Sequence, residues 1–74
     1  MKDAATQITV RVNDVARTFA APIRLLAALG ELGLAERRGV AIAINDTVIP
    51  RSHWIERELN DGESLLVIQA TQGG

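Results

Sequence analysis

The chain has 74 residues, 47% of them apolar, with a formal net charge of -1 and no cysteine. This length allows one domain with a small core, and the lack of cysteine excludes disulfides, thiol nucleophiles and thiolate metal sites. The near-neutral charge argues against a nucleic-acid partner, and no apolar run approaches the ~20 residues that span a bilayer. With one histidine, no signal-peptide core and no membrane segment, we expect a cytoplasmic protein that binds no metal and no resident cofactor.

The first part of the chain predicts a β-hairpin. Residues 1–6 are small and polar, and we expect them to form a loose lead. Apolar and polar residues then alternate over 8–12, which is the period of a half-buried strand. The pair Asn13-Asp14 tolerates the backbone angles of a tight turn, so a second strand near 15–19 can fold back on the first.

A single helix is predicted from Pro22 to about Gly33. Proline suits the first turn of a helix, and Ile23, Leu26 and Leu29 recur at helical spacing. Gly33 is a candidate for the C-terminal cap. We expect Leu26 and Leu29 to be buried against a sheet.

The second half predicts three more strands. Residues 40–44 are apolar at every position, which indicates a strand covered on both faces or carrying one exposed apolar face. The following elements are, in order, a turn at Asn45-Asp46, a short strand at 48–49 stopped by Pro50, one helical turn at 51–54, a short extended piece at 55–59, a turn at 60–62 and a last strand at 64–70. The resulting strand and helix order is β-β-α-β-β-β, so one helix covers one face of the sheet.

Alternation within the strands sorts their side chains into two faces. We expect the larger set, or the set that matches the helix, to pack under the helix, with Ile42 and Val67 buried there; its members are Val40, Ile42, Ile44, Leu65 and Val67. The other face then presents an apolar patch that marks a partner-binding site; its members are Ala41, Ala43, Leu66 and Ile68. A register shifted by one residue would place the patch in the core instead.

The chain resembles the ThiS family of ubiquitin-like β-grasp proteins, the sulfur carriers of thiamine biosynthesis. The resemblance is carried by an Asn turn at residues 43–46, the Val-Ile-Pro-Arg segment at 48–51 and Trp54. It is also carried by an Asp-Gly turn within residues 59–63 and by the final Gly73-Gly74. It implies an α+β fold, a mixed sheet with one helix packed on one face. It also implies a flexible C-terminal tail, residues 71–74, on a single domain of 1–74.

The resemblance further implies the chemistry. An activating enzyme uses ATP to adenylate the carboxylate of Gly74, sulfur from a persulfide donor replaces AMP, and the thiocarboxylate donates sulfur to thiazole synthase. Gly73, Gln72 and Thr71 would be recognised as the tail. The chain is then a cosubstrate and not an enzyme. Without side chains, the terminal glycines are thin enough to enter a partner's active site, although a Gly-Gly end can also be only frayed.

Two other functions remain open from the sequence. A molybdopterin-type sulfur carrier would share the fold and the Gly-Gly end, and a non-covalent β-grasp interaction module would not use that end. Several polar residues are assigned structural roles: Asn45, Asp46 and Asp61 as turn formers, His53 with Trp54 as a partly buried pair, Arg51 as a possible partner of Glu56 or Glu58, and Arg37-Arg38 as a solvated loop.

Overall fold

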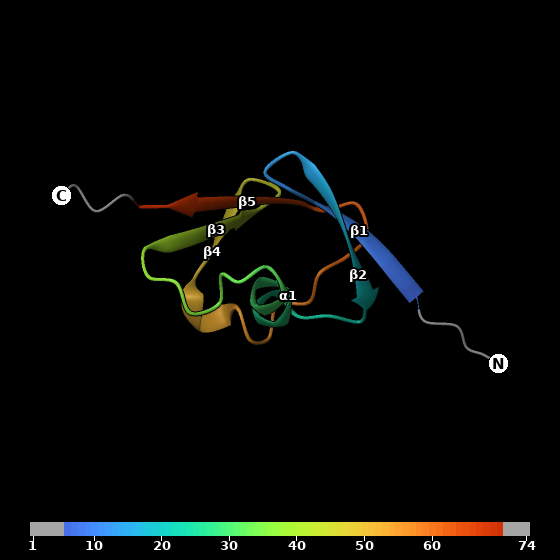
Figure 1. Ribbon diagram of the computed structural model, residues 1–74, viewed down its shortest axis with the longest axis horizontal. Coiled ribbons are helices and arrows are strands. Elements are labelled where there is room, and N and C mark those ends of the chain that lie inside the picture. The colour runs from blue at the N-terminus through green and yellow to red at the C-terminus, as the bar shows by residue number, and fades with distance from the viewer. Residues whose placement is uncertain (1–5, 71–74) are drawn as a thin grey trace.

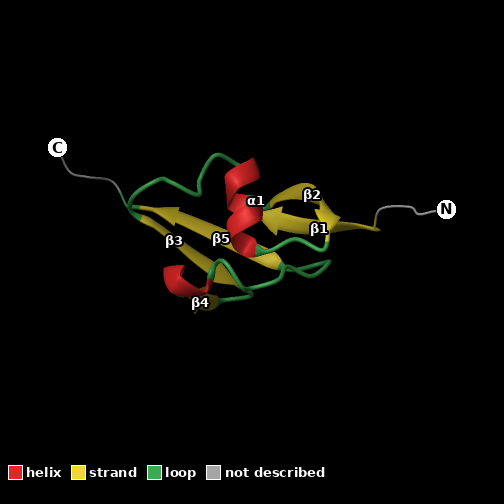
Figure 2. Ribbon diagram, turned by 90° about the horizontal axis from the view of Figure 1, so that it is seen from below, coloured by secondary structure: helices red, strands yellow, loops and turns green. Residues whose placement is uncertain are grey.

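The computed structural model describes residues 6–70, which form a mixed five-stranded sheet with one α-helix on one face. The strands stand in the order β2-β1-β5-β3-β4, with β1 and β5 parallel and every other neighbouring pair antiparallel. Figure 1 shows α1 end-on beneath the sheet, and Figure 2 shows it lying across one face. The bounds are β1 Thr6–Val12, β2 Val15–Ala21, α1 Leu25–Glu31, β3 Val40–Ile44, β4 Thr47–Ile49, a 3-10 helix Arg51–His53 and β5 Ser64–Gln69.

The predicted element order and the one-sided helix are confirmed. The predicted lead is one residue too long, because Thr6 belongs to β1, where it pairs with Ala21. The remaining lead residues, 1–5, lie outside the described part of the chain.

Two tight turns of the same kind close the two hairpins. Asn13 and Asp14 have φ of 50° and 69°, and Asn45 and Asp46 have φ of 49° and 70°. Positive φ at both central residues defines the type I′ turn, whose twist matches that of paired strands. Asn and Asp adopt this region more readily than other non-glycine residues. The turns therefore fix the registers of β1 with β2 and of β3 with β4.

Helix α1 begins three residues later than predicted. Arg24 is extended, with φ −91° and ψ 157°, and forms an isolated β-bridge with Glu58. The first helical N–H, that of Leu25, donates to the carbonyl of Arg57 at 2.7 Å. A neighbouring segment thus satisfies a donor that a helix start leaves unpaired. This pairing holds the chain extended through Arg24, so Pro22 precedes the helix and does not begin it.

The C-terminal end of α1 agrees with the prediction for Gly33, which has φ +77°. The N–H of Leu34 donates to the carbonyl of Leu29 at 2.7 Å, and that of Gly33 donates to the carbonyl of Gly30 at 3.1 Å. This pair of bonds is the Schellman motif, which satisfies the last carbonyls of a helix. The side chains of Leu29 and Leu34 both pack in or against the core, so the cap also fixes the exit of the chain.

The core lies between α1 and the covered face of the sheet. Leu29 and Ile42 are buried as predicted, whereas Leu26 and Val67 are only partly buried against the core. The buried apolar cluster consists of Ile8, Val10, Phe19, Ile23, Leu25, Ala28, Leu29, Val40, Ile42, Ile44, Trp54, Leu59 and Leu65. The predicted register of β3 and β5 is therefore correct.

Trp54 anchors the segment that follows β4. Its side chain is 1% exposed, its indole N–H donates to the carbonyl of Ile49 at 2.9 Å, and the Arg51 guanidinium lies 4.8 Å from its ring centroid. Arg51 also donates to the carbonyl of Ala35 at 3.0 Å, a contact with the loop after α1 and not with a nearby glutamate. His53 is exposed, so the predicted half-buried pair with Trp54 does not form. Residues 55–59 are mostly turn and coil, with Glu58 alone in a β-bridge.

Candidate functional site

The face of the sheet opposite α1 carries an apolar patch on β3, β4 and β5. Val48, Ala43 and Leu66 stand in one cross-strand row, and Ala41 and Ile68 stand in the next. Val48 is 68% exposed, Leu66 49% and Ile68 50%. We call these five residues the open-face patch. Exposed apolar side chains gathered on one face of a small domain are typical of a protein-binding surface.

The prediction for this face needs two changes. Ala43 lies on the predicted face but is only 7% exposed, because its small side chain stands between the larger Val48 and Leu66, so it supports the patch more than it offers contact. Val48 was missed, although it is more exposed than Leu66 and Ile68. The type I′ turn at residues 45–46 was the available signal, since a two-residue turn places residue 48 opposite residue 43.

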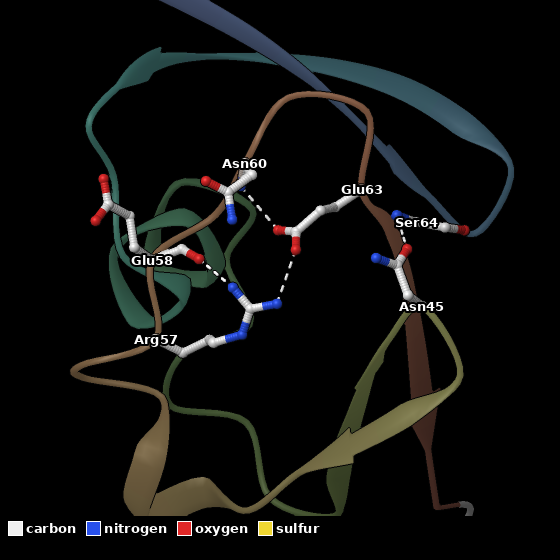
Figure 3. Close-up of polar contacts among 6 residues, drawn as sticks. All are labelled: Asn45, Arg57, Glu58, Asn60, Glu63 and Ser64. Atoms are coloured by element: carbon white, nitrogen blue, oxygen red, sulfur yellow. Dashed lines mark hydrogen bonds and ion pairs between the residues drawn. The ribbon is translucent and has the colours of Figure 1, made fainter.

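Strand β5, which carries Leu66 and Ile68 of the patch, is held at its first residue and near its middle by turn asparagines. The side-chain amide of Asn13 accepts a hydrogen bond from the N–H of Val67 at 2.8 Å and donates to its carbonyl at 3.2 Å. These two hydrogen bonds extend the β1–β5 pairing beyond the end of β1. Asn45 accepts from the N–H of Ser64 at 3.0 Å, as Figure 3 shows, and its own N–H donates to the Ser64 carbonyl at 2.8 Å.

The turn before β5 is held in the same way. The carboxylate of Asp61 accepts from the N–H of Thr9 at 2.7 Å, and the N–H of Gly62 donates to the Thr9 carbonyl at 2.8 Å. These contacts support the structural roles predicted for Asn45 and Asp61.

One ion pair closes the loop that leads into β5 (Figure 3). The Arg57 guanidinium donates to Glu63 at 2.7 Å and also to the Glu58 carbonyl, and the Asn60 N–H donates to Glu63 at 2.8 Å. Burial alone would raise the pKa of the Glu63 carboxyl, but the bonds from Arg57 and Asn60 outweigh it and hold that pKa below its usual range. The network fixes the loop and contains no free base or nucleophile.

The predicted reactive tail lies outside the described residues. Thr71, Gln72, Gly73 and Gly74 follow directly on Ala70, whose N–H donates to the carbonyl of Gly39 at 2.7 Å. The structure therefore gives the position of Ala70, from which the tail begins, and it places this position at the far end of the strand that carries Leu66 and Ile68.

Residues 6–70 contain no group of three or more His, Cys, Asp or Glu side chains that could hold a metal ion. Within the same range, no helix is long and apolar enough to cross a bilayer.

The sheet order, the single helix on one face and the parallel central pair β1–β5 define a ubiquitin-like β-grasp domain. The model of the ThiS family matches residues 10–74. This chain belongs to the ThiS family.

Individual relatives agree with this assignment. The chain is 39% identical over 36 residues to the sulfur carrier protein ThiS of Escherichia coli, a match covering 49% of this chain and 54% of that protein. It is 35% identical over 63 residues to a thiazole synthase of Paramagnetospirillum magneticum, covering 85% of this chain and 19% of that protein. The chain thus spans about half of one of these curated relatives and about a fifth of the other.

Solved structures show the same fold. The crystal structure of the thiamine biosynthesis protein ThiS of Geobacter metallireducens superposes with a TM-score of 0.77 at 22% identity, covering 90% of this chain and all of that one. A solution structure of a thiamine biosynthesis protein from the same organism gives a TM-score of 0.73 over 90% of this chain and 88% of that one.

Proposed function

We propose that this chain is a sulfur carrier for thiazole formation in thiamine biosynthesis, with the sulfur held as a thiocarboxylate on Gly74. The observation that carries the proposal is the family match, which extends from residue 10 through Gly73-Gly74. The chain acts in this proposal as a protein cosubstrate, and partner enzymes perform the catalysis.

The proposed reaction begins with an unreactive group. An α-carboxylate has a pKa near ~3.5 and is ionised at neutral pH, which makes it a poor electrophile. An activating enzyme joins the Gly74 carboxylate to AMP from ATP and releases pyrophosphate. The terminal sulfur of a persulfide donor then attacks the acyl carbon, and AMP leaves. A thiol then attacks the donor's sulfur in the resulting acyl disulfide, forms a disulfide with the donor and releases the thiocarboxylate on Gly74. Because ATP is consumed, we place the reaction in the cytoplasm.

The open-face patch is the proposed docking surface for the activating enzyme. Leu66, Ile68 and Val48 supply its exposed apolar area, and Ala41 and Ala43 complete it. The patch and the tail are joined by β5, so docking at Leu66 and Ile68 would bring the start of the tail to the partner's surface. Thr71, Gln72 and Gly73 are proposed as the residues that pass into the active site.

Thiazole synthase is the proposed acceptor of the sulfur. Support comes from the Paramagnetospirillum magneticum relative, because that thiazole synthase includes a segment similar to 85% of this chain. A carrier-like segment within the length of a thiazole synthase is the arrangement expected if the two act together.

Intact-mass measurement tests the proposal. The purified chain is incubated with ATP, the activating enzyme and a persulfide donor, and the expected product has one oxygen of its C-terminal carboxylate replaced by sulfur. A variant lacking Gly74 should keep its melting temperature, because its core is unchanged, but should form neither adenylate nor thiocarboxylate. Thiazole formation by this variant in a reconstituted assay would refute the carrier function. A thiocarboxylate that thiazole synthase does not use would instead refute the choice of acceptor.

A further inference from the structure

The described part of the chain ends at a close contact between two main-chain segments. The last pair of the β3–β5 ladder is Val40 with Gln69. One step further, the N–H of Ala70 donates to the carbonyl of Gly39 at 2.7 Å, so the pairing continues to the last described residue. Gly39 comes from the loop between α1 and β3, 31 residues before Ala70 in the numbering.

Gly39 suits this contact for two reasons. Its φ is +72°, in the left-handed region that favours glycine. A Cβ atom at this position would also lie 3.3 Å from the Cβ of Ala70 and 3.6 Å from its carbonyl oxygen. Gly33 and Gly62 share the positive φ, at +77° and +85°, but an added Cβ would meet nothing within 4 Å at either. The close approach is therefore specific to Gly39 among these three glycines.

We propose that Gly39 is a positioning residue for the carrier reaction. By letting its backbone lie against Ala70, it keeps the chain in the sheet up to residue 70 and so sets where the tail begins. This inference rests on the proposed function, since the starting point matters only if Gly74 must enter a partner's active site. The four residues 71–74 span at most about 14 Å when extended. With so short a reach, the position of Ala70 decides where Gly74 can arrive.

The contact can be disturbed with little change in backbone strain. Asparagine is among the residues that adopt positive φ most readily, so Gly39→Asn mainly adds the Cβ that would meet Ala70. Gly33→Asn makes the same change at a nearly equal φ with open space around it, and it serves as the matched control. Hydrogen exchange at the Ala70 amide reports the contact directly, and Gly39→Asn should speed it whereas Gly33→Asn should not.

The functional test is the rate of pyrophosphate release by the activating enzyme as a function of carrier concentration. In Gly39→Asn, Ala70 must shift by a few tenths of an ångström. We expect kcat to fall on the order of tenfold, because a misplacement of about 1 Å can cost ~100-fold and this shift is smaller. The KM for the carrier should change by less than about twofold, because the open-face patch that supplies docking is intact. Removing the colliding methyl in Gly39→Asn/Ala70→Gly should restore most of kcat, relative to Ala70→Gly alone.

The outcomes separate the two proposals. A wild-type chain that the enzyme does not adenylate overturns the carrier function and the positioning role with it. If the wild type is adenylated and Gly39→Asn keeps its kcat although Ala70 exchange is faster, only the positioning role is overturned. An equal fall of kcat in Gly33→Asn, or no recovery in the double variant, also overturns it, because the loss would then not come from the contact with Ala70.

Discussion

Ile68 offers a direct test of whether the open-face patch is a docking surface. It lies on β5 opposite Ala41, on the face away from α1, and its side chain is 50% exposed. Ile68→Asp should therefore leave the protein folded, because the core cluster does not include this residue. It should weaken binding to the activating enzyme, because the apolar area that a partner would cover is replaced by a charge.

The magnitude follows from the exposed half of the side chain. Complete burial of an isoleucine side chain contributes about 1.5–3 kcal/mol, so the half that remains exposed corresponds to about 1 kcal/mol in a complex. A loss of about 1.4 kcal/mol is a tenfold change in Kd, so removing this contact alone should raise Kd several-fold, by about five- to tenfold. Burying the new carboxylate without a partner adds a further cost, so about fivefold is the lower end of the expected effect. The other half of the Ile68 side chain is already covered in the folded domain. Losing that burial in Ile68→Asp should lower the free energy of unfolding by about 1 kcal/mol.

Ile55→Asp is the matched control. Ile55 is 65% exposed and lies outside the sheet, in the turn after the 3-10 helix, so the same chemical change is made away from the patch. Calorimetric titration with the activating enzyme, together with thermal unfolding of each variant, measures both quantities. We expect Ile68→Asp to bind more weakly than the wild type and Ile55→Asp to bind equally well. Wild-type affinity in Ile68→Asp, or an equal loss in both variants, would refute the assignment of the patch.

Two further predictions concern stability. Leu29 has no exposed surface and packs between α1 and the sheet, so Leu29→Ala should lower the free energy of unfolding in urea by about 2–5 kcal/mol; a loss below about 1 kcal/mol would contradict the described packing. The pKa of Glu63 is lower in the folded than in the unfolded chain, so its contribution is present above the ordinary carboxyl pKa of about 4.3 and disappears as the pH falls through the lower folded value. Urea unfolding from pH 7 to about pH 3 should accordingly show a steeper acid loss in the wild type than in Glu63→Gln, and equal pH profiles would show that the Arg57 contact does not stabilise the fold.

The faces of β3 were predictable from the sequence because one side chain set is clearly larger. Ile42 and its neighbours at 40 and 44 outsize the two alanines between them, and the larger set is buried. In β5 the two sets are similar in size, so the placement of Leu66 and Ile68 on the open face depended on matching the other set to the helix; the structure has both half exposed. Exposure itself was less predictable, since Ala43 is covered by neighbours on two other strands and alternation along its own strand cannot show this.

The beginning of α1 could not be predicted, for a different reason. Local pattern places Pro22 well for a first helical turn, but residues 23 and 24 are held extended by residues 58 and 59. The carbonyl of Arg57 then satisfies the N–H of Leu25. A partner so far along the chain leaves no periodic signal near the helix, and tertiary hydrogen bonding therefore overrides the local preference.

The two turn asparagines show how a correct local prediction can miss the larger role. Asn13 and Asn45 were read as residues that permit tight turns, and their positive φ confirms this. Their side chains also bind β5, Asn13 at Val67, 54 residues away, and Asn45 at Ser64, 19 residues away. A glycine would permit either turn equally well, so turn geometry alone does not require asparagine at these positions. Only the amide adds the long-range bonds, and both sets of bonds end on the strand that joins the open-face patch to the start of the tail. The strand on which the proposed reaction depends is therefore held by side chains from the turns next to both neighbouring strands, and these bonds fix β5 in a domain with a small core.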